Sequence, residues 1–154
     1  GMRETGEIHP AWFIPLYDDL VYRLSDCKHQ GSKRLLLSIL YNLPVTVPVS
    51  VELLNYSLDH MLSLQESIGV QSLSIRMAYR LCKHEPELLS ELKLILEHAN
   101  TEFYSTGVKT AIRNILKKIK NNSSTALDNN LINKKSPSFL FYLLFSLTFV
   151  TVKT

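Results

Sequence analysis

The sequence predicts an all-α fold, a right-handed α-α superhelix of about three helical hairpins, and three observations predict it. Apolar residues recur at steps of three and four in six consecutive segments, the spacing of one face of a helix. The links between segments are short, so neighbouring helices should run antiparallel and pair. No segment has the pattern of a strand. The nearest candidate, residues 45–51, is unlike a strand because Pro44 and Pro48 cannot donate the backbone hydrogen bonds of a sheet.

Length and composition favour one domain with one core. The chain has 154 residues, of which 45% are hydrophobic and 20% charged, as in a soluble globular protein. Its formal net charge of +3 is too small by itself to indicate a nucleic-acid or membrane partner. We expect a helical repeat domain over residues 8–120, followed by a linker and tail over residues 121–154.

The first hairpin should begin at Pro15 and its first helix should end at Gly31. The residues expected to face inward from this helix are Leu16, Leu20, Leu24 and Cys27. A second, shorter helix precedes the break made by the two prolines. Its apolar residues are Leu35, Leu36, Ile39, Leu40 and Leu43.

The second hairpin should begin at Ser50, whose hydroxyl can accept a bond from a free backbone amide. The helix that follows ends before Gly69, and its inward residues are Val51, Leu54, Leu58, Met61 and Leu62. Residues 71–83 then carry two apolar stripes. A helix that is apolar on two sides is expected in the interior of a stack.

The third hairpin should begin at Pro86, which loses no hydrogen bond at the first helical position. Its stripe is formed by Leu88, Leu92, Ile95 and Ala99, widened by Leu89 and Leu96, with Asn100 as the C-terminal cap. The last helix covers residues 108–120, capped by Ser105 or Thr106. Its stripe is formed by Val108, Ala111, Ile112, Ile115, Leu116 and Ile119.

A repeated pattern connects the second helices of the three hairpins. Arg34, Arg76 and Lys109 each precede a small or aliphatic run, at intervals typical of helical-hairpin repeats. With HEPELLSELKLIL and GVKTAIRNILKKI, residues 84–96 and 107–119, the chain resembles the HEAT-like (HEAT and armadillo) helical repeat family, in a short bacterial type. The resemblance implies a stack of hairpins. The alternative fold is a six-helix bundle, which buries amphipathic helices at similar angles.

The sequence shows no catalytic or metal-binding motif. None of the five histidines has the spacing of a ligand pair, and no glycine-rich phosphate loop is present. We therefore expect no enzyme activity, no metal and no cofactor. Cys27 and Cys82 are expected as buried free thiols in a reducing, cytoplasmic compartment, with a disulfide between them as the alternative. Cys82 is expected to be a core residue rather than a nucleophile.

Cations on the second helices are the candidate binding residues. If equivalent helices stack side by side, these cations should merge into one strip. The expected contact residues are Arg76, Arg80, Lys109, Arg113 and Lys117. The chain is thus predicted to be a scaffolding module for an unknown protein partner, with nucleic-acid binding as the alternative and solvated surface cations as the simplest explanation. Nucleic acid is less favoured because no aromatic residues are interleaved with the cations.

The composition changes after residue 120. Residues 121–138 are rich in Asn, Ser and Lys and should form a flexible linker, and residues 139–152 are almost continuously apolar. This apolar run is shorter than a membrane-spanning helix normally requires. Three interpretations remain open, namely docking on the open end of the stack, a weak membrane anchor, or sequence foreign to the natural protein. A membrane partner is expected only if the tail is native.

Overall fold

A computed structural model describes residues 10–126 of the chain, with side chains from residue 14 to residue 123. Within this range there are six α-helices, one short 3-10 helix and no strand. The elements are α1 (Pro10–Asp26), α2 (Gln30–Asn42), α3 (Val51–Met61), α4 (Ile68–Cys82), α5 (Pro86–Glu97), η2 (Thr101–Phe103) and α6 (Thr106–Ala126). Residues 121–126, which we expected to open the flexible linker, instead form the last turns of α6, so that prediction is wrong for these residues. The rest of the expected linker and tail, from residue 127 onward, lies outside the described residues. Of the helices described, none is both long and apolar enough to cross a membrane.

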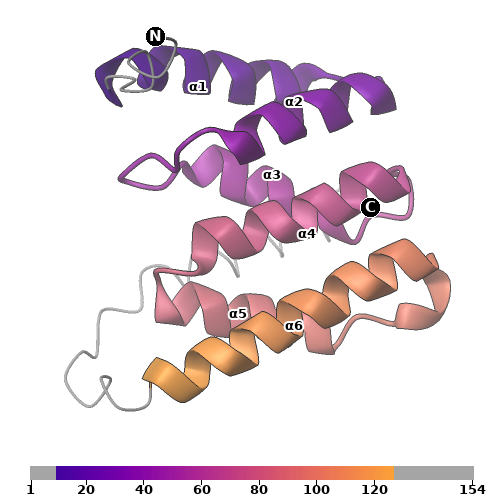
Figure 1. Ribbon diagram of the computed structural model, residues 1–154. Helices are drawn as coiled ribbons and strands as arrows, with labels where there is room; N and C mark the ends of the chain where they lie inside the picture. Colours follow the sequence, from indigo (N-terminus) through magenta and orange to yellow (C-terminus); the bar gives the residue numbers. More distant parts are fainter. Residues whose placement is uncertain (1–9, 127–154) are drawn as a thin grey trace, which may run out of the picture.

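The six helices form three antiparallel hairpins that follow one another by translation, as Figure 1 shows. The pairs are α1 with α2, α3 with α4, and α5 with α6, as predicted. The second helices form one layer, in which α4 packs against both α2 and α6, whereas the first helices touch one another much less. This stack confirms the predicted superhelix of hairpins rather than a bundle around a shared centre. The layer of second helices is the inner side, because its members approach one another most closely.

Local capping explains where most helices begin. The hydroxyls of Ser50, Ser67 and Ser105 accept backbone amides at the starts of α3, α4 and α6, over 3.3, 3.4 and 3.3 Å. Pro86 opens α5, so the predicted starts at Ser50, Pro86 and Ser105 are confirmed. The prediction for Asn100 is wrong. Its side chain accepts the Glu102 amide and caps η2, while His98 ends α5.

The predicted bounds of the first hairpin need correction. Pro15 lies inside α1, which starts five residues earlier at Pro10, and Gly31 is the second residue of α2 rather than the end of α1. Leu16 is 48% exposed, because the core-facing stripe is Tyr17, Val21 and Leu24. Steps of three and four counted back from Leu24 lead to Val21 and Tyr17, so a tyrosine occupies the place that we assigned to leucine.

Two other predicted stripes are partly wrong. In α2, Leu35 is 62% exposed and Ile39 is also exposed, while Leu37 and Leu40 are buried. Three consecutive leucines allow more than one stripe, and the sequence pattern alone cannot choose between them. In α3, Val51 is 42% exposed because it occupies the first helical position, ahead of the buried Leu53 and Leu54.

Equivalent positions of successive hairpins are separated by a constant number of residues, which the spacing of the cations does not show. Gly31, Gly69 and Gly107 are each the second residue of a second helix, and the same interval of 38 residues separates them (31 to 69 to 107). Arg34, Arg76 and Lys109 are therefore not equivalent, since they occupy the fifth, ninth and fourth positions of their helices. The glycines give the correct register of the hairpins.

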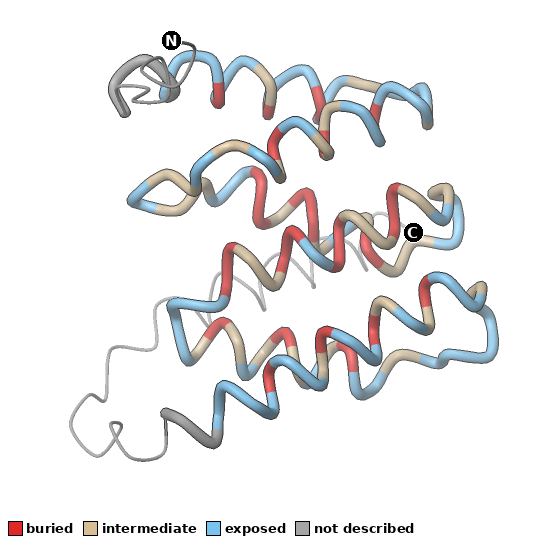
Figure 2. Tube along the Cα trace, in the orientation of Figure 1, coloured by how far each residue is buried: buried red, intermediate tan, exposed pale blue. Residues whose placement is uncertain are grey.

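This register explains why so many residues of α4 are buried, as the colouring of Figure 2 shows along this helix. One face, Val70, Ser74, Met77 and Leu81, corresponds position by position to the buried face of α6, Val108, Ile112, Ile115 and Ile119. The other face begins with Gln71, Ile75 and Ala78 and corresponds to the buried Lys33, Leu37 and Leu40 of α2. The predicted interior helix is thereby confirmed, because α4 carries the contacts to both neighbouring hairpins.

Candidate functional site: a cationic groove between α4 and α6

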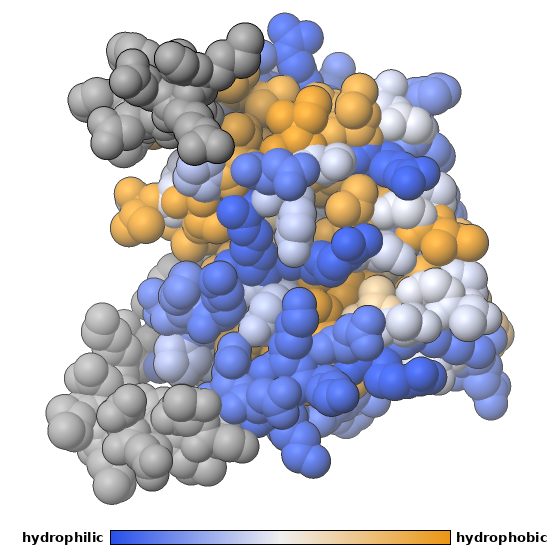
Figure 3. Space-filling model, in the orientation of Figure 1, coloured by the Kyte–Doolittle hydropathy of each residue, from blue (hydrophilic) through white to orange (hydrophobic). Residues whose placement is uncertain are grey.

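The inner face of the stack is hollowed between α4 and α6. Figure 3 shows hydrophilic residues gathered over these two helices, with more apolar surface over α1 and α2. The groove has a volume of about 410 Å³. It is lined from α4 by Ser72 and Arg76 and from α6 by Gly107, Thr110, Ala111, Asn114, Ile115, Lys117, Lys118 and Asn121.

The groove exists because a large side chain at one junction is replaced by a small one at the next. Between α2 and α4, the Arg34 side chain lies over Gly69, so close that a Cβ added to the glycine would be 2.9 Å from Arg34 Cδ. In the 38-residue register (34 to 72, 69 to 107), the residues at the second junction are Ser72 and Gly107. The short serine leaves open the space that Arg34 fills at the first junction.

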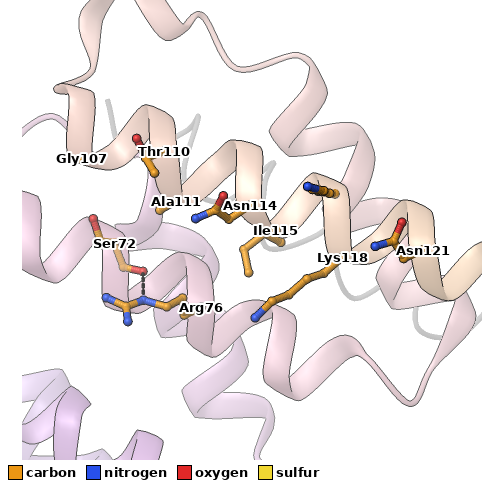
Figure 4. A pocket seen from close by; sticks show the side chains of 10 residues that line it. Ser72, Arg76, Gly107, Thr110, Ala111, Asn114, Ile115, Lys118 and Asn121 are labelled. Atoms are coloured by element: carbon orange, nitrogen blue, oxygen red, sulfur yellow. Dashed lines mark hydrogen bonds between the residues drawn. The ribbon is translucent and has the colours of Figure 1, made fainter.

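Cations stand on both sides of the groove, as Figure 4 shows. Arg76 lies on α4, where its Nε donates to the Ser72 carbonyl oxygen over 3.4 Å. Lys118 reaches from α6 toward α4, and its ammonium lies 5.9 Å from the centre of the Tyr79 ring. No aspartate or glutamate is among the lining residues. Anionic groups would therefore meet positive charge from two helices.

Contacts between a cation and a tyrosine ring repeat at both junctions. The Arg80 guanidinium of α4 lies 5.3 Å from the centre of the Tyr41 ring of α2, and Lys118 of α6 faces Tyr79 of α4 in the same way. Both members of the pair recur after 38 residues (41 to 79, 80 to 118). Cation–π contacts of this kind contribute about 0.5–2 kcal/mol. They hold the second helices side by side and so maintain the walls of the groove.

The five predicted contact residues do not form one continuous strip. Arg76 and Lys117 line the groove. Arg80 is half-buried and donates to the carbonyl oxygens of Leu40 and Tyr41, so it links α4 to the end of α2. Lys109 and Arg113 occupy the positions on α6 that are buried on α4, as Gln71 and Ile75. They therefore lie on the outer face of the last hairpin rather than beside Arg76.

Sequence reasoning missed eight of the ten groove residues, among them Ser72, Asn114 and Lys118. The signal that could have found them is the glycine interval, because it aligns Ser72 with Arg34 and Lys118 with Arg80. The cation pattern aligns the helices on Arg34, Arg76 and Lys109 instead. That alignment shifts the sequence of α6 relative to that of α4 and so pairs Arg113 with Arg80, which are not equivalent positions.

A second polar cluster joins the first two hairpins. Lys33 Nζ lies 2.7 Å from Glu66 Oε1, Gln30 Nε2 donates to Glu66 Oε2 over 2.7 Å, and the Ser67 amide donates to Gln30 Oε1 over 2.9 Å. Desolvation raises the pKa of Glu66, but the hydrogen bonds from Lys33 and Gln30 outweigh it and hold this pKa below its ordinary value. The cluster fastens α2 to the link before α4.

The ionisable groups of the described residues give no catalytic arrangement. Cys82 is 1% exposed, and burial raises the pKa of its thiol to about 12, which confirms the predicted core cysteine. Both Cys27 and Cys82 are free thiols, but Cys27 is only partly buried, so the prediction of two buried thiols is wrong for Cys27. Within residues 14–123, no group of three His, Cys, Asp or Glu side chains could hold a metal ion. The inner face instead presents a groove lined by three cations and by no carboxylate.

A family model described as a HEAT repeat domain matches residues 1–119. No curated protein and no solved structure matches the chain.

Proposed function

Because the chain belongs to the HEAT repeat domain family, we propose that it is a non-catalytic protein-interaction module that holds its partner on the inner face of α2, α4 and α6. Domains of this family are generally scaffolds for protein interaction. Stacked hairpins present a broad, rigid surface whose shape follows from the rotation between repeats. The observation that carries the proposal is the open groove between α4 and α6, which lies on that inner layer.

Site-specific photo-crosslinking in a lysate of the native host tests this proposal. A benzoylphenylalanine at Asn114, exposed on α6 in the groove, should capture a discrete protein. The matched control places the same photoreactive residue at Ser90, which is exposed on α5 in the layer of first helices. Crosslinks from Ser90 alone would contradict the proposal, as would products from Asn114 that disappear after nuclease treatment.

Nucleic-acid binding is the second candidate function, favoured by the cations that face the groove without any lining carboxylate. No aromatic residue lines the groove, and the nearby Tyr79 ring is already faced by Lys118, so bases have no platform for stacking. A salt titration separates the two candidates. Phosphate contacts require the logarithm of the affinity for an oligonucleotide to fall steeply and linearly with the logarithm of the salt concentration.

A further inference from the structure

The groove between α4 and α6 has the chemistry of a carboxylate-binding site. We propose that it binds an acidic, extended segment of a protein partner, with the partner's side-chain carboxylates against Arg76, Lys117 and Lys118. This inference rests on the proposed function and deepens it, because it assigns the chemical class of the partner and the part of the inner face that holds it.

Charge complementarity is the first argument. Three of the ten lining residues are cations, contributed by both walls, and none is an acid. Within residues 14–123, the Arg76 guanidinium makes one hydrogen bond, from Nε to the Ser72 carbonyl oxygen, and it forms no ion pair. Its terminal amino groups can therefore bind a carboxylate in the two-pronged geometry that arginine favours.

The length of the groove is the second argument. Its lining on α6 runs from Gly107 to Asn121, and a helix rises 1.5 Å per residue, so the groove extends over about 21 Å. An extended peptide covers that distance with about six residues. A single small anion would occupy only one end. The shape therefore fits a chain with several carboxylates.

The uncharged lining residues provide the third argument. Ser72, Thr110 and Asn114 supply hydroxyl and amide groups that can bond a peptide backbone, and Ala111 and Ile115 give an apolar floor. Aromatic rings on which bases could stack are absent from the lining. A peptide thus uses more of the groove than a nucleic acid would.

The test uses the full chain and a fluorescent peptide of about eight residues in which glutamate and serine alternate. Binding is followed by fluorescence anisotropy. Arg76→Glu should weaken binding about tenfold or more, because it replaces an attraction with a repulsion. Arg113→Glu makes the same change of charge on the outer face of α6 and should stay within about twofold of the parent chain.

A second variant separates groove binding from general attraction. Ser72→Arg adds a positive charge but fills the space over Gly107, as Arg34 does over Gly69. We expect it to weaken binding despite the added charge. If this variant fails to fold by circular dichroism, Asn114→Trp fills the groove from an exposed position on α6.

Loss of binding in Arg76→Glu and in the filled-groove variant, with Arg113→Glu unchanged, supports the inference. Equal losses in Arg76→Glu and Arg113→Glu, stronger binding by Ser72→Arg, or a preference for a single-stranded oligonucleotide of equal length would overturn it. If the parent chain ignores the acidic peptide but still crosslinks a protein from Asn114, this inference fails and the proposed function stands. If both measurements fail, the proposed function fails as well.

Discussion

At the scale of single residues, Lys33 shows how a cation can be part of the core. It is 9% exposed, and Glu66 neutralises it at 2.7 Å. Lys33→Ala would leave the carboxylate of Glu66 with the His60 ring, at 3.6 Å, as its only basic neighbour, so we expect it to lower the free energy of unfolding by about 3 kcal/mol. Urea denaturation followed by circular dichroism measures this loss.

The control for Lys33→Ala removes both charges. The double variant Lys33→Met with Glu66→Leu should be more stable than Lys33→Ala alone, because it leaves no unpaired charge in the interior. Equal losses in the single and double variants would show that the pair contributes nothing beyond packing.

The same pair should make stability depend on pH. Because the pKa of Glu66 is lower in the folded chain than in the unfolded one, the ionised carboxylate stabilises the fold above its ordinary pKa of 4.5. This contribution is lost as the pH falls from there through the lower pKa of the folded state. Urea melts should therefore show the parent chain to be more stable than a Glu66→Gln variant at pH 7, and this difference should shrink as the pH falls below 4.5.

The two thiols should differ in reactivity. Cys27 is partly exposed, whereas Cys82 is buried with a pKa raised to about 12. In the native protein a thiol reagent should label Cys27 first and reach Cys82 only after denaturation. Cys27→Ser should remove the fast phase, and a fast phase that survives this substitution would contradict the burial of Cys82.

Residues whose partners lie far away in the sequence could not be predicted. The core leucines of α5 and the isoleucines of α6 were predicted because their spacing is local information. Lys33 was not, because its burial depends on Glu66, which follows 33 residues later in a link without regular structure. Arg80 was placed on a binding strip, but its partners are carbonyl oxygens on another helix.

At the scale of elements, the 38-residue register pairs Ile75 of α4 with Arg113 of α6 (75 to 113). Ile75 is buried against a neighbouring hairpin, while Arg113 is exposed at the same position of the last hairpin. Ile75→Arg should therefore lower the free energy of unfolding by about 3 kcal/mol or more, because it buries an unpaired charge. Arg113→Ile should change it by no more than about 0.5 kcal/mol.

Thermal melting of the two variants makes the comparison. Similar losses in both variants would mean that the outer face of α6 is covered and that the register does not separate the two faces. The expected contrast also explains the charges on α6. Among the described hairpins, no further helix packs on this face of α6, and Lys109 and Arg113 make the face polar.

Element boundaries were predictable where a cap fixes them. Ser50, Pro86 and Ser105 act through the backbone groups next to them, so the sequence alone reveals them. The stripes of α1 and α2 were less predictable. Both helices are rich in neighbouring apolar residues, and only the position of the adjacent hairpin decides that Leu37 is buried and Leu35 exposed.

At the scale of the whole molecule, the stack of three hairpins followed from six helical segments joined by short links. The candidate site did not follow, because it depends on the register between hairpins. Aligning Arg34 with Arg76 predicts one long cationic strip, whereas aligning Gly31, Gly69 and Gly107 predicts a filled junction followed by an open one. The cations were correctly placed on the second helices, but only the register shows which of them share a groove.

The burial of α4 on two faces couples the folding of the three hairpins. Each outer hairpin buries its apolar face only by packing against the middle hairpin, so neither outer hairpin has a hydrophobic core of its own. Loss of α4 would expose both ends at once, and unfolding should be a single cooperative event. A protease would then meet either a fully folded stack or an open chain, with no population of partly folded stacks in which the groove has lost one wall.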